Sequence, residues 1–221
     1  MKNFKFITLL ILFLSLTTFN PFKDKGNNSG IFKINKLIIS GNSILNQNRL
    51  KNDLSFLIGK NLTFVNNKDI DQVLNRYKLI KSASIKKVYP GTIKIQIIED
   101  ELIAVLQNKK NKFYITKNGN LINIKDILKA QNLPIVFGNK KNFMILYKTL
   151  EEIKFPIQKI KKYLFFKIGR WDIILQDKKV IKLPQNDYKS SLRNFLNIMI
   201  NYDMEEKMIF DYRIKDQLIL K

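Results

Sequence analysis

Cysteine and histidine are both absent from the 221 residues of the sequence. This excludes disulfides, cysteine nucleophiles, zinc fingers and any catalytic triad that depends on histidine. Phosphate-binding loops of the type GxxxxGK or GxGxxG are missing as well. We therefore expect a protein that is not an enzyme, with no catalytic residues, no metal site, no cofactor and no small-molecule substrate.

Arginine is scarce, because only Arg49, Arg76, Arg170, Arg193 and Arg213 stand among the 40 basic residues. The formal net charge of +22 would suit a nucleic-acid binder. Proteins that read phosphates and bases favour the bidentate fork of arginine, however, and here lysines are spread along the whole chain. Abundant Lys, Ile and Asn are what an AT-biased coding sequence would produce. We therefore interpret the charge as compositional background and expect no nucleic-acid partner.

Residues 6–19 form an uncharged apolar stretch, FITLLILFLSLTTF, and Lys2 and Lys5 precede it. Its length fits the core of a signal peptide or a short membrane anchor. No convincing A-x-A-like pattern of small residues marks a cleavage site, which favours an uncleaved single membrane helix, so that residues 1–22 are a cytoplasmic stub and membrane anchor. The lysines keep the N-terminus in the cytoplasm by the positive-inside rule, so that everything after residue 22 is exported.

A linker over residues 23–30 leads to a first predicted domain over residues 31–100. Apolar residues alternate as in strands over residues 31–40, 83–89 and 92–99, and the last two meet at Pro90-Gly91. Between the first and second strands, two stretches have apolar residues at helical spacing, and the first of them uses Leu50, Leu54, Leu57 and Ile58. Asn67 is the expected N-cap of the second helix. The order β-α-α-β-β predicts a two-layer α+β domain with helices on one face of the sheet.

The remaining residues, 101–221, predict a β-rich mixed domain with two helices. The helices are expected at 143–153 and 188–202, among strands that include 168–175, 180–183, 209–214 and 217–220. Trp171 is the only tryptophan, and we expect it to pack in the core, with a partner-binding role as the alternative. Asp211 and Arg213 share one face of a strand, which favours a structural ion pair over a binding site.

Short motifs in collinear order carry a family resemblance. Residues 38–42 (IISGN), residues 88–95 (VYPGTIKI) and the closing Glu99 resemble a POTRA domain. The second half adds residues 118–122 (NGNLI), 170–173 (RWDI), 182–184 (KLP) and 209–213 (IFDYR). With these pieces the chain resembles the FtsQ/DivIB family of bacterial cell-division proteins.

The resemblance implies a non-enzymatic, single-pass inner-membrane protein with its bulk in the periplasm. Such a protein would act at the division septum, where it binds and organises other divisome proteins. The alternative is an exported POTRA-containing envelope assembly factor that handles extended polypeptides. That class carries several POTRA repeats and a barrel of strands, and the 121 residues after a single POTRA domain leave little room for them.

The end of the chain is the expected partner site. A terminal strand that closes a sheet leaves an open edge, which can accept a strand from another chain. In the family that this chain resembles, the last strands receive a small coiled-coil partner, FtsB, which is itself paired with FtsL. We therefore expect the partner-binding residues to be Gln217, Leu218, Ile219, Leu220 and Lys221, together with Tyr212 and Arg213.

Overall fold

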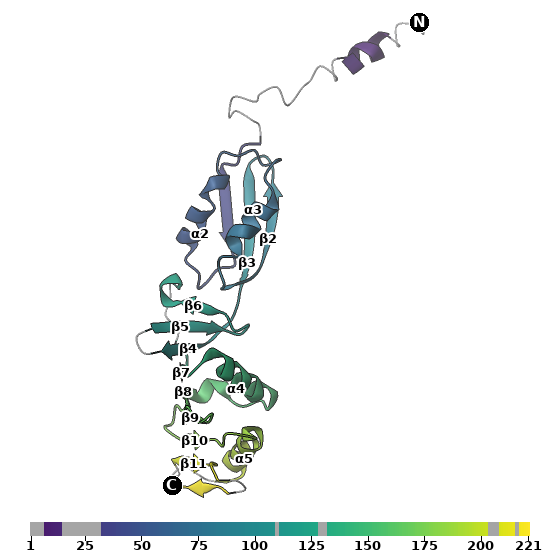
Figure 1. Ribbon diagram of the computed structural model, residues 1–221. Coiled ribbons are helices and arrows are strands. Elements are labelled where there is room, and N and C mark those ends of the chain that lie inside the picture. The colour runs from purple at the N-terminus through teal and green to yellow at the C-terminus, as the bar shows by residue number, and fades with distance from the viewer. Residues whose placement is uncertain (1–6, 15–31, 109–110, 128–131, 203–207, 215–216) are drawn as a thin grey trace.

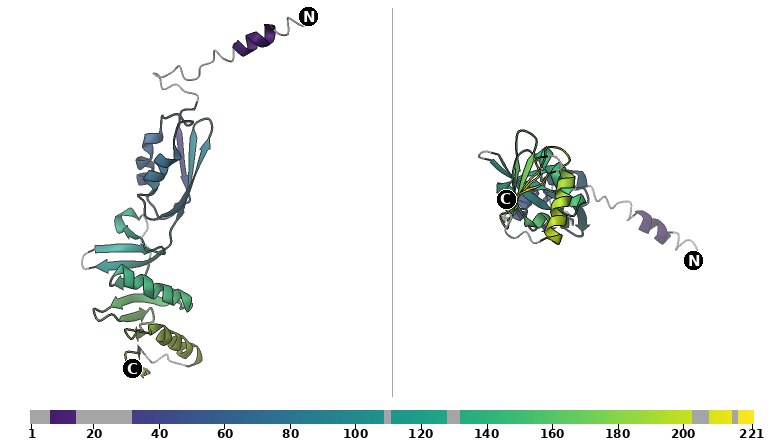
Figure 2. Two further views of the ribbon diagram at one scale, coloured as in Figure 1. Left: turned by 45° about the vertical axis from the view of Figure 1, so that its right-hand side comes forward. Right: turned by 90° about the horizontal axis from the view of Figure 1, so that it is seen from below.

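The computed structural model describes residues 7–14, 32–108, 111–127, 132–202, 208–214 and 217–221. The described part after residue 31 is elongated, with a three-stranded sheet near the N-terminal end and a nine-stranded sheet below it (Figures 1 and 2). The strand orders are β1-β3-β2 and β12-β11-β10-β9-β8-β7-β4-β5-β6.

The three-stranded sheet has the predicted β-α-α-β-β order. Its elements are β1 (Lys36–Ser40), α2 (Gln47–Asp53), the 3-10 turn η1 (Ser55–Leu57), α3 (Asn67–Leu74), β2 (Ile80–Val88) and β3 (Thr92–Glu99). Both helices lie over one face of the sheet, as expected (Figure 1). Leu50, Leu54 and Ile70 from this helical layer are fully buried, together with Ile93 and Ile95 of β3. The apolar periodicity therefore predicted this layer correctly.

Two details of these helices differ from the prediction. The first helix ends at Asp53 and continues as η1, after which Ile58 has an extended backbone and is half exposed. Ile58 therefore does not share the buried face of Leu50, Leu54 and Leu57. The N-cap of α3 is Asn66 rather than Asn67, since the Asn66 side chain accepts a hydrogen bond from the Lys68 N–H.

The nine-stranded sheet carries its helices on one face. Its first elements are β4 (Leu102–Asn108), β5 (Asn111–Thr116), β6 (Leu121–Asn123), η2 (Ile124–Asp126), β7 (Ile135–Phe137), α4 (Lys140–Glu152) and η3 (Ile157–Lys159). Then follow β8 (Ile160–Phe165), β9 (Trp171–Leu175), β10 (Val180–Lys182), α5 (Tyr188–Asn201), β11 (Ile209–Asp211) and β12 (Ile219–Leu220). Helices α4 and α5 are neighbours, because Phe155, just after α4, stacks on Phe195 of α5, and Lys189 pairs with Glu152 at 2.7 Å. The β-rich domain with two helices is thus one mixed sheet.

Two predicted core and charge roles are confirmed in this sheet. Trp171 is buried, and its ring lies 4.7 Å from the ring of Phe165, measured between centroids. Asp211 and Arg213 form the expected ion pair.

The described residues of the N-terminus form a short helix over residues 7–14. Within the described parts of the chain, no helix is long and apolar enough to cross a membrane. The rest of the predicted anchor, residues 1–6 and 15–22, and the linker 23–30 lie outside the described residues.

Candidate partner-binding edge at the C-terminus

The predicted partner residues lie at the far end of the nine-stranded sheet. β12 is the last strand in the sheet order, and it pairs on one side with β11 through the registers Phe210↔Leu220 and Asp211↔Ile219. Among the described residues, no strand pairs with the other side of β12. The edge is therefore open in the part of the chain that the structure describes.

The hydrogen bonds of β12 fix which backbone groups face outward. Ile209 and Lys221 exchange two bonds, of 3.0 Å from the Ile209 N–H and 3.1 Å from the Lys221 N–H. Hydrogen-bonded and non-bonded pairs alternate along an antiparallel ladder, so Ile219 also faces β11, whereas Leu220 points its N–H and C=O away from it. The donor and acceptor that this strand offers to an incoming chain therefore belong to Leu220.

Side chains of the same segment alternate between the two faces of the sheet. Leu218 and Leu220 are partly buried and pack against the main core of this sheet, while Ile219 is more exposed on the opposite side. Gln217 and Lys221 are exposed. The five residues thus form a surface edge that is attached to the core by two leucines.

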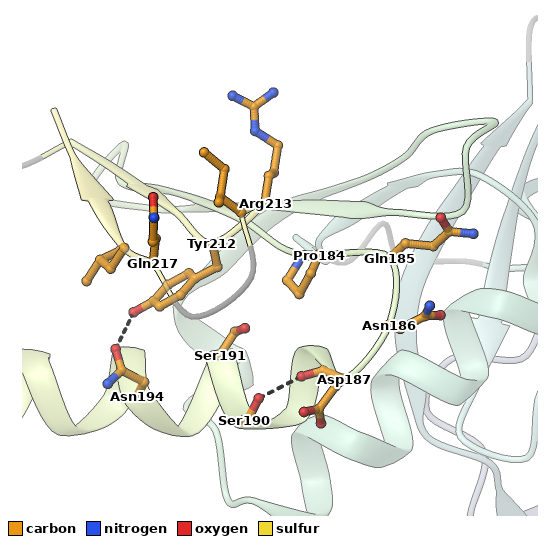
Figure 3. A pocket seen from close by; sticks show the side chains of 12 residues that line it. Pro184, Gln185, Asn186, Asp187, Ser190, Ser191, Asn194, Tyr212, Arg213 and Gln217 are labelled. Carbon is orange, nitrogen blue, oxygen red and sulfur yellow. Dashed lines mark hydrogen bonds between the residues drawn. The ribbon is translucent and has the colours of Figure 1, made fainter.

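Tyr212 and Arg213 play different parts. The Tyr212 ring is buried, its hydroxyl donates a 3.0 Å hydrogen bond to Asn194 Oδ1 of α5, and burial raises the pKa of this hydroxyl. Arg213 instead turns away from α5 (Figure 3), and its Nε donates to Asp211 Oδ1 at 2.8 Å. Tyr212 therefore attaches the edge to α5, and only Arg213 of the two offers a charge at the surface.

A pocket of about 580 Å³ lies beside this edge. Figure 3 shows its lining, which combines the loop before α5, the first turns of α5 and the segment that leads to β12. The lining residues are Pro184, Gln185, Asn186, Asp187, Ser190, Ser191, Asn194, Tyr212, Arg213, Ile214, Gln217 and Leu218. Most of them carry uncharged polar groups, so the pocket suits hydrogen bonding rather than a buried charge.

The sequence prediction did not include the α5 side of this pocket. β10 and β11 are parallel neighbours that α5 connects, and this crossover places the start of α5 next to residues 212–214, 217 and 218. The order strand, helix, strand over residues 180–211 was the available signal, because such a connection usually joins parallel neighbours.

Two aspartates near the edge differ in their surroundings. Hydrogen bonds from the Arg213 guanidinium hold the pKa of Asp211 below its usual value. Burial raises the pKa of Asp172, whose Oδ1 has no hydrogen-bond partner among the described residues. Arg170 Nε lies 3.8 Å from that oxygen, too far for a hydrogen bond.

Two protein-family models match this chain. Residues 32–100 match the model of the POTRA domain, FtsQ-type, and residues 104–213 match the model of the cell division protein FtsQ/DivIB C-terminal region.

Curated relatives carry the same names. The cell division protein FtsQ of Rickettsia prowazekii is 33% identical over 131 residues, which cover 56% of this chain and 48% of that protein. FtsQ of Rickettsia typhi is 26% identical over 73% of this chain and 61% of its own length. DivIB of Listeria monocytogenes is 24% identical over 76% of this chain and 58% of its own length. In each case the chain spans less than two-thirds of the relative.

A solved structure, the major extracytoplasmic domain of DivIB from Geobacillus stearothermophilus, matches 48% of this chain and 91% of that chain at 14% identity and a TM-score of 0.32. That likeness is too weak to support a statement about the fold. The two family models, which lie end to end from residue 32 to residue 213, carry the assignment: the chain belongs to the FtsQ/DivIB family of cell division proteins.

Proposed function

We propose that this chain is a non-enzymatic protein of the bacterial inner membrane that binds and organises other divisome proteins at the septum. The family assignment supports a role in division, and the FtsQ-type match of residues 32–100 favours this role over that of an envelope assembly factor. In this proposal residues 1–22 are a cytoplasmic stub and anchor, 23–30 a linker, 31–100 the POTRA domain and 101–221 the C-terminal β domain. The bulk of the chain is periplasmic.

The main partner binds by adding a strand to β12. The observation that carries this proposal is the open edge, where Leu220 presents an outward N–H and C=O. Backbone pairing would give affinity, and the polar pocket beside Gln217 and Leu218 would select side chains of the added strand. A coiled-coil protein of the FtsB/FtsL type, with an extended segment after its helix, is the partner that this mode implies.

The test compares two variants at one position. Leu220→Pro removes the outward donor but no donor of the β11–β12 ladder, and an edge strand tolerates proline. Leu220→Ala truncates the same side chain and keeps the N–H, so it controls for lost packing. We expect the proline variant to bind the FtsB/FtsL-type complex at least about tenfold more weakly than the alanine variant, since it loses a hydrogen bond and introduces a ring into the interface. Equal affinities in a binding titration would contradict strand addition.

Localisation is tested separately with a fluorescent fusion of the full chain. We expect a fluorescent band at midcell during constriction. After cell lysis, we expect the fluorescence in the membrane fraction and not in the soluble fraction. A uniform envelope signal would contradict a septal role. It would not affect the test of strand addition at β12, which measures binding directly.

A further inference from the structure

Figure 1 shows that one end of the three-stranded sheet is turned away from the nine-stranded sheet. Apolar side chains are exposed at that end. Backbone hydrogen bonds bring three segments together there. The Ile34 N–H donates to Lys60 O at 2.9 Å, and the Asn35 N–H donates to Gly91 O at 3.0 Å. We call residues 32–36, 55–65 and 86–92 the POTRA tip. Its exposed apolar residues are Phe32, Phe56, Ile58, Phe64 and Tyr89.

The backbone itself keeps these side chains at the surface. Leu57 is buried in η1, so its neighbours Phe56 and Ile58 point outward. Val65 is buried in the same way, and the adjacent Phe64 is 69% exposed. The exposure is therefore a property of well-packed segments and does not depend on a loose loop.

The POTRA tip is also basic. Its three segments contain Lys33, Lys36, Lys60, Lys86 and Lys87 and no aspartate or glutamate. Lys60 Nζ lies 4.8 Å from the centre of the Phe56 ring, which places a cation and an aromatic ring on the same surface. Asp69 of α3 lines a small hollow together with Lys60 and Phe64, so one carboxylate stands close to this surface. The combination of exposed aromatic rings and lysines is typical of groups that sit at a membrane interface.

We infer that the POTRA tip docks onto an anionic lipid surface. This inference rests on the proposed membrane anchor, because only residues 20–31 separate the apolar stretch from the tip. Twelve residues reach at most ~43 Å when fully extended, so the tip stays within reach of the bilayer. An anchor and a basic, aromatic contact act together, as two weak membrane signals do in other proteins. The docked tip would hold the elongated molecule upright on the membrane.

The absence of cysteine permits a clean test with the full chain. Thr63→Cys places one thiol on the exposed tip without removing an aromatic ring, and Ile200→Cys places one on exposed α5 as the matched control. Each variant is labelled with an environment-sensitive fluorophore and reconstituted into vesicles that contain doxyl-labelled lipid. The vesicles are either pure phosphatidylcholine or contain 30% phosphatidylglycerol.

We expect quenching at position 63 and none at position 200, and stronger quenching with phosphatidylglycerol. Lys33→Gln and Lys60→Gln should each weaken the docked state about fivefold, as expected for one lysine near an anionic surface. If the chain floats with vesicles but position 63 stays unquenched, the docking is refuted while the anchor stands. If quenching at position 63 is the same with and without phosphatidylglycerol, recognition of an anionic lipid surface is refuted. If the chain floats with neither kind of vesicle, both the docking and the anchor are refuted. If it floats only with vesicles that contain phosphatidylglycerol, the docking is supported and the anchor is refuted.

Discussion

Asp172 and Asp211 lie on opposite sides of Lys182, in one row across β9, β10 and β11, and their pKa values are shifted in opposite directions. The difference follows from their partners. Arg213 donates several hydrogen bonds to Asp211, whereas Asp172 is buried and its Oδ1 accepts none from the described residues. The charged form of Asp211 therefore stabilises the fold, whereas the charged form of Asp172 destabilises it.

This pair predicts opposite effects of two matched substitutions. The lowered pKa means that Asp211 stabilises the fold above its unfolded pKa of about 4, and that this is lost as the pH falls through the folded pKa. The raised pKa means that Asp172 costs stability once the pH exceeds that unfolded value. At pH 7 we expect Asp211→Asn to lower the free energy of unfolding by about 1–3 kcal/mol and Asp172→Asn to raise it. Both differences should shrink below pH 4 in urea titrations, and shifts of the same sign would contradict the assignment.

Glu99 closes the three-stranded sheet by binding a loop. Its carboxylate accepts backbone hydrogen bonds from Ser43, Ile44 and Leu45, the last at 2.7 Å, and a further bond from the Ser43 hydroxyl. Glu99→Ala leaves these donors without their acceptor, and we expect it to cost about 2–3 kcal/mol in chemical denaturation. Ser43→Ala removes the hydroxyl bond alone and should cost under about 1 kcal/mol. Equal costs would show that the backbone donors contribute little.

Gly41 and Gly59 allow the cost of a close approach to be measured. Both have positive φ, +83° and +88°, so alanine is strained at either position. At Gly41 a Cβ would overlap the carbonyl oxygen of Ile97, whereas at Gly59 the nearest atom is Lys33 Cε at 3.6 Å. We expect Gly59→Ala to cost about 1–2 kcal/mol and Gly41→Ala to cost more than twice as much in thermal unfolding. Similar melting temperatures would mean that the strand shifts to admit a side chain at Gly41.

Leu57 and Ile58 test the corrected end of the first helix. Leu57 is buried, and Ile58 is half exposed on the POTRA tip. Leu57→Ala should cost about 2–5 kcal/mol, because it leaves a cavity in the core, whereas Ile58→Ala should change stability by less than about 0.5 kcal/mol. If Leu57→Ala and Ile58→Ala destabilise the protein equally, the result would favour the longer helix that the apolar spacing predicted.

The sequence predicted those elements whose apolar pattern is local. Helix α5, for example, was expected at 188–202 and runs from Tyr188 to Asn201. Ile58 was misassigned because spacing alone does not reveal where a helix gives way to a 3-10 turn. The boundary of α3 was ambiguous because Asn66 and Asn67 are equally good caps.

Non-local pairing could not be derived in the same way. Strands β4, β7 and β8 are parallel neighbours, and so are β10 and β11, yet no short-range pattern records which strand lies beside which. For the same reason the pocket beside β12 joins residues between 184 and 194 to residues 212–214, 217 and 218, and the prediction found members of the second group only. Tyr212 was expected to face a partner, but burial of its ring depends on α5, which the local sequence around residue 212 does not describe.

The order of the nine strands also has a mechanical consequence. The strands are stacked like rungs along the length of the molecule, with β12 at one end and β6 beside the POTRA unit (Figure 1). Eight spacings of about 4.8 Å separate the two ends by roughly 40 Å. A force applied between a partner on β12 and the N-terminus would act along the inter-strand hydrogen bonds. These bonds would then break one after another, whereas a force along the strands would load all the bonds of one strand together. The two-residue strand β12 would open first, so the molecule releases its load at the partner end before the rest of the sheet comes apart.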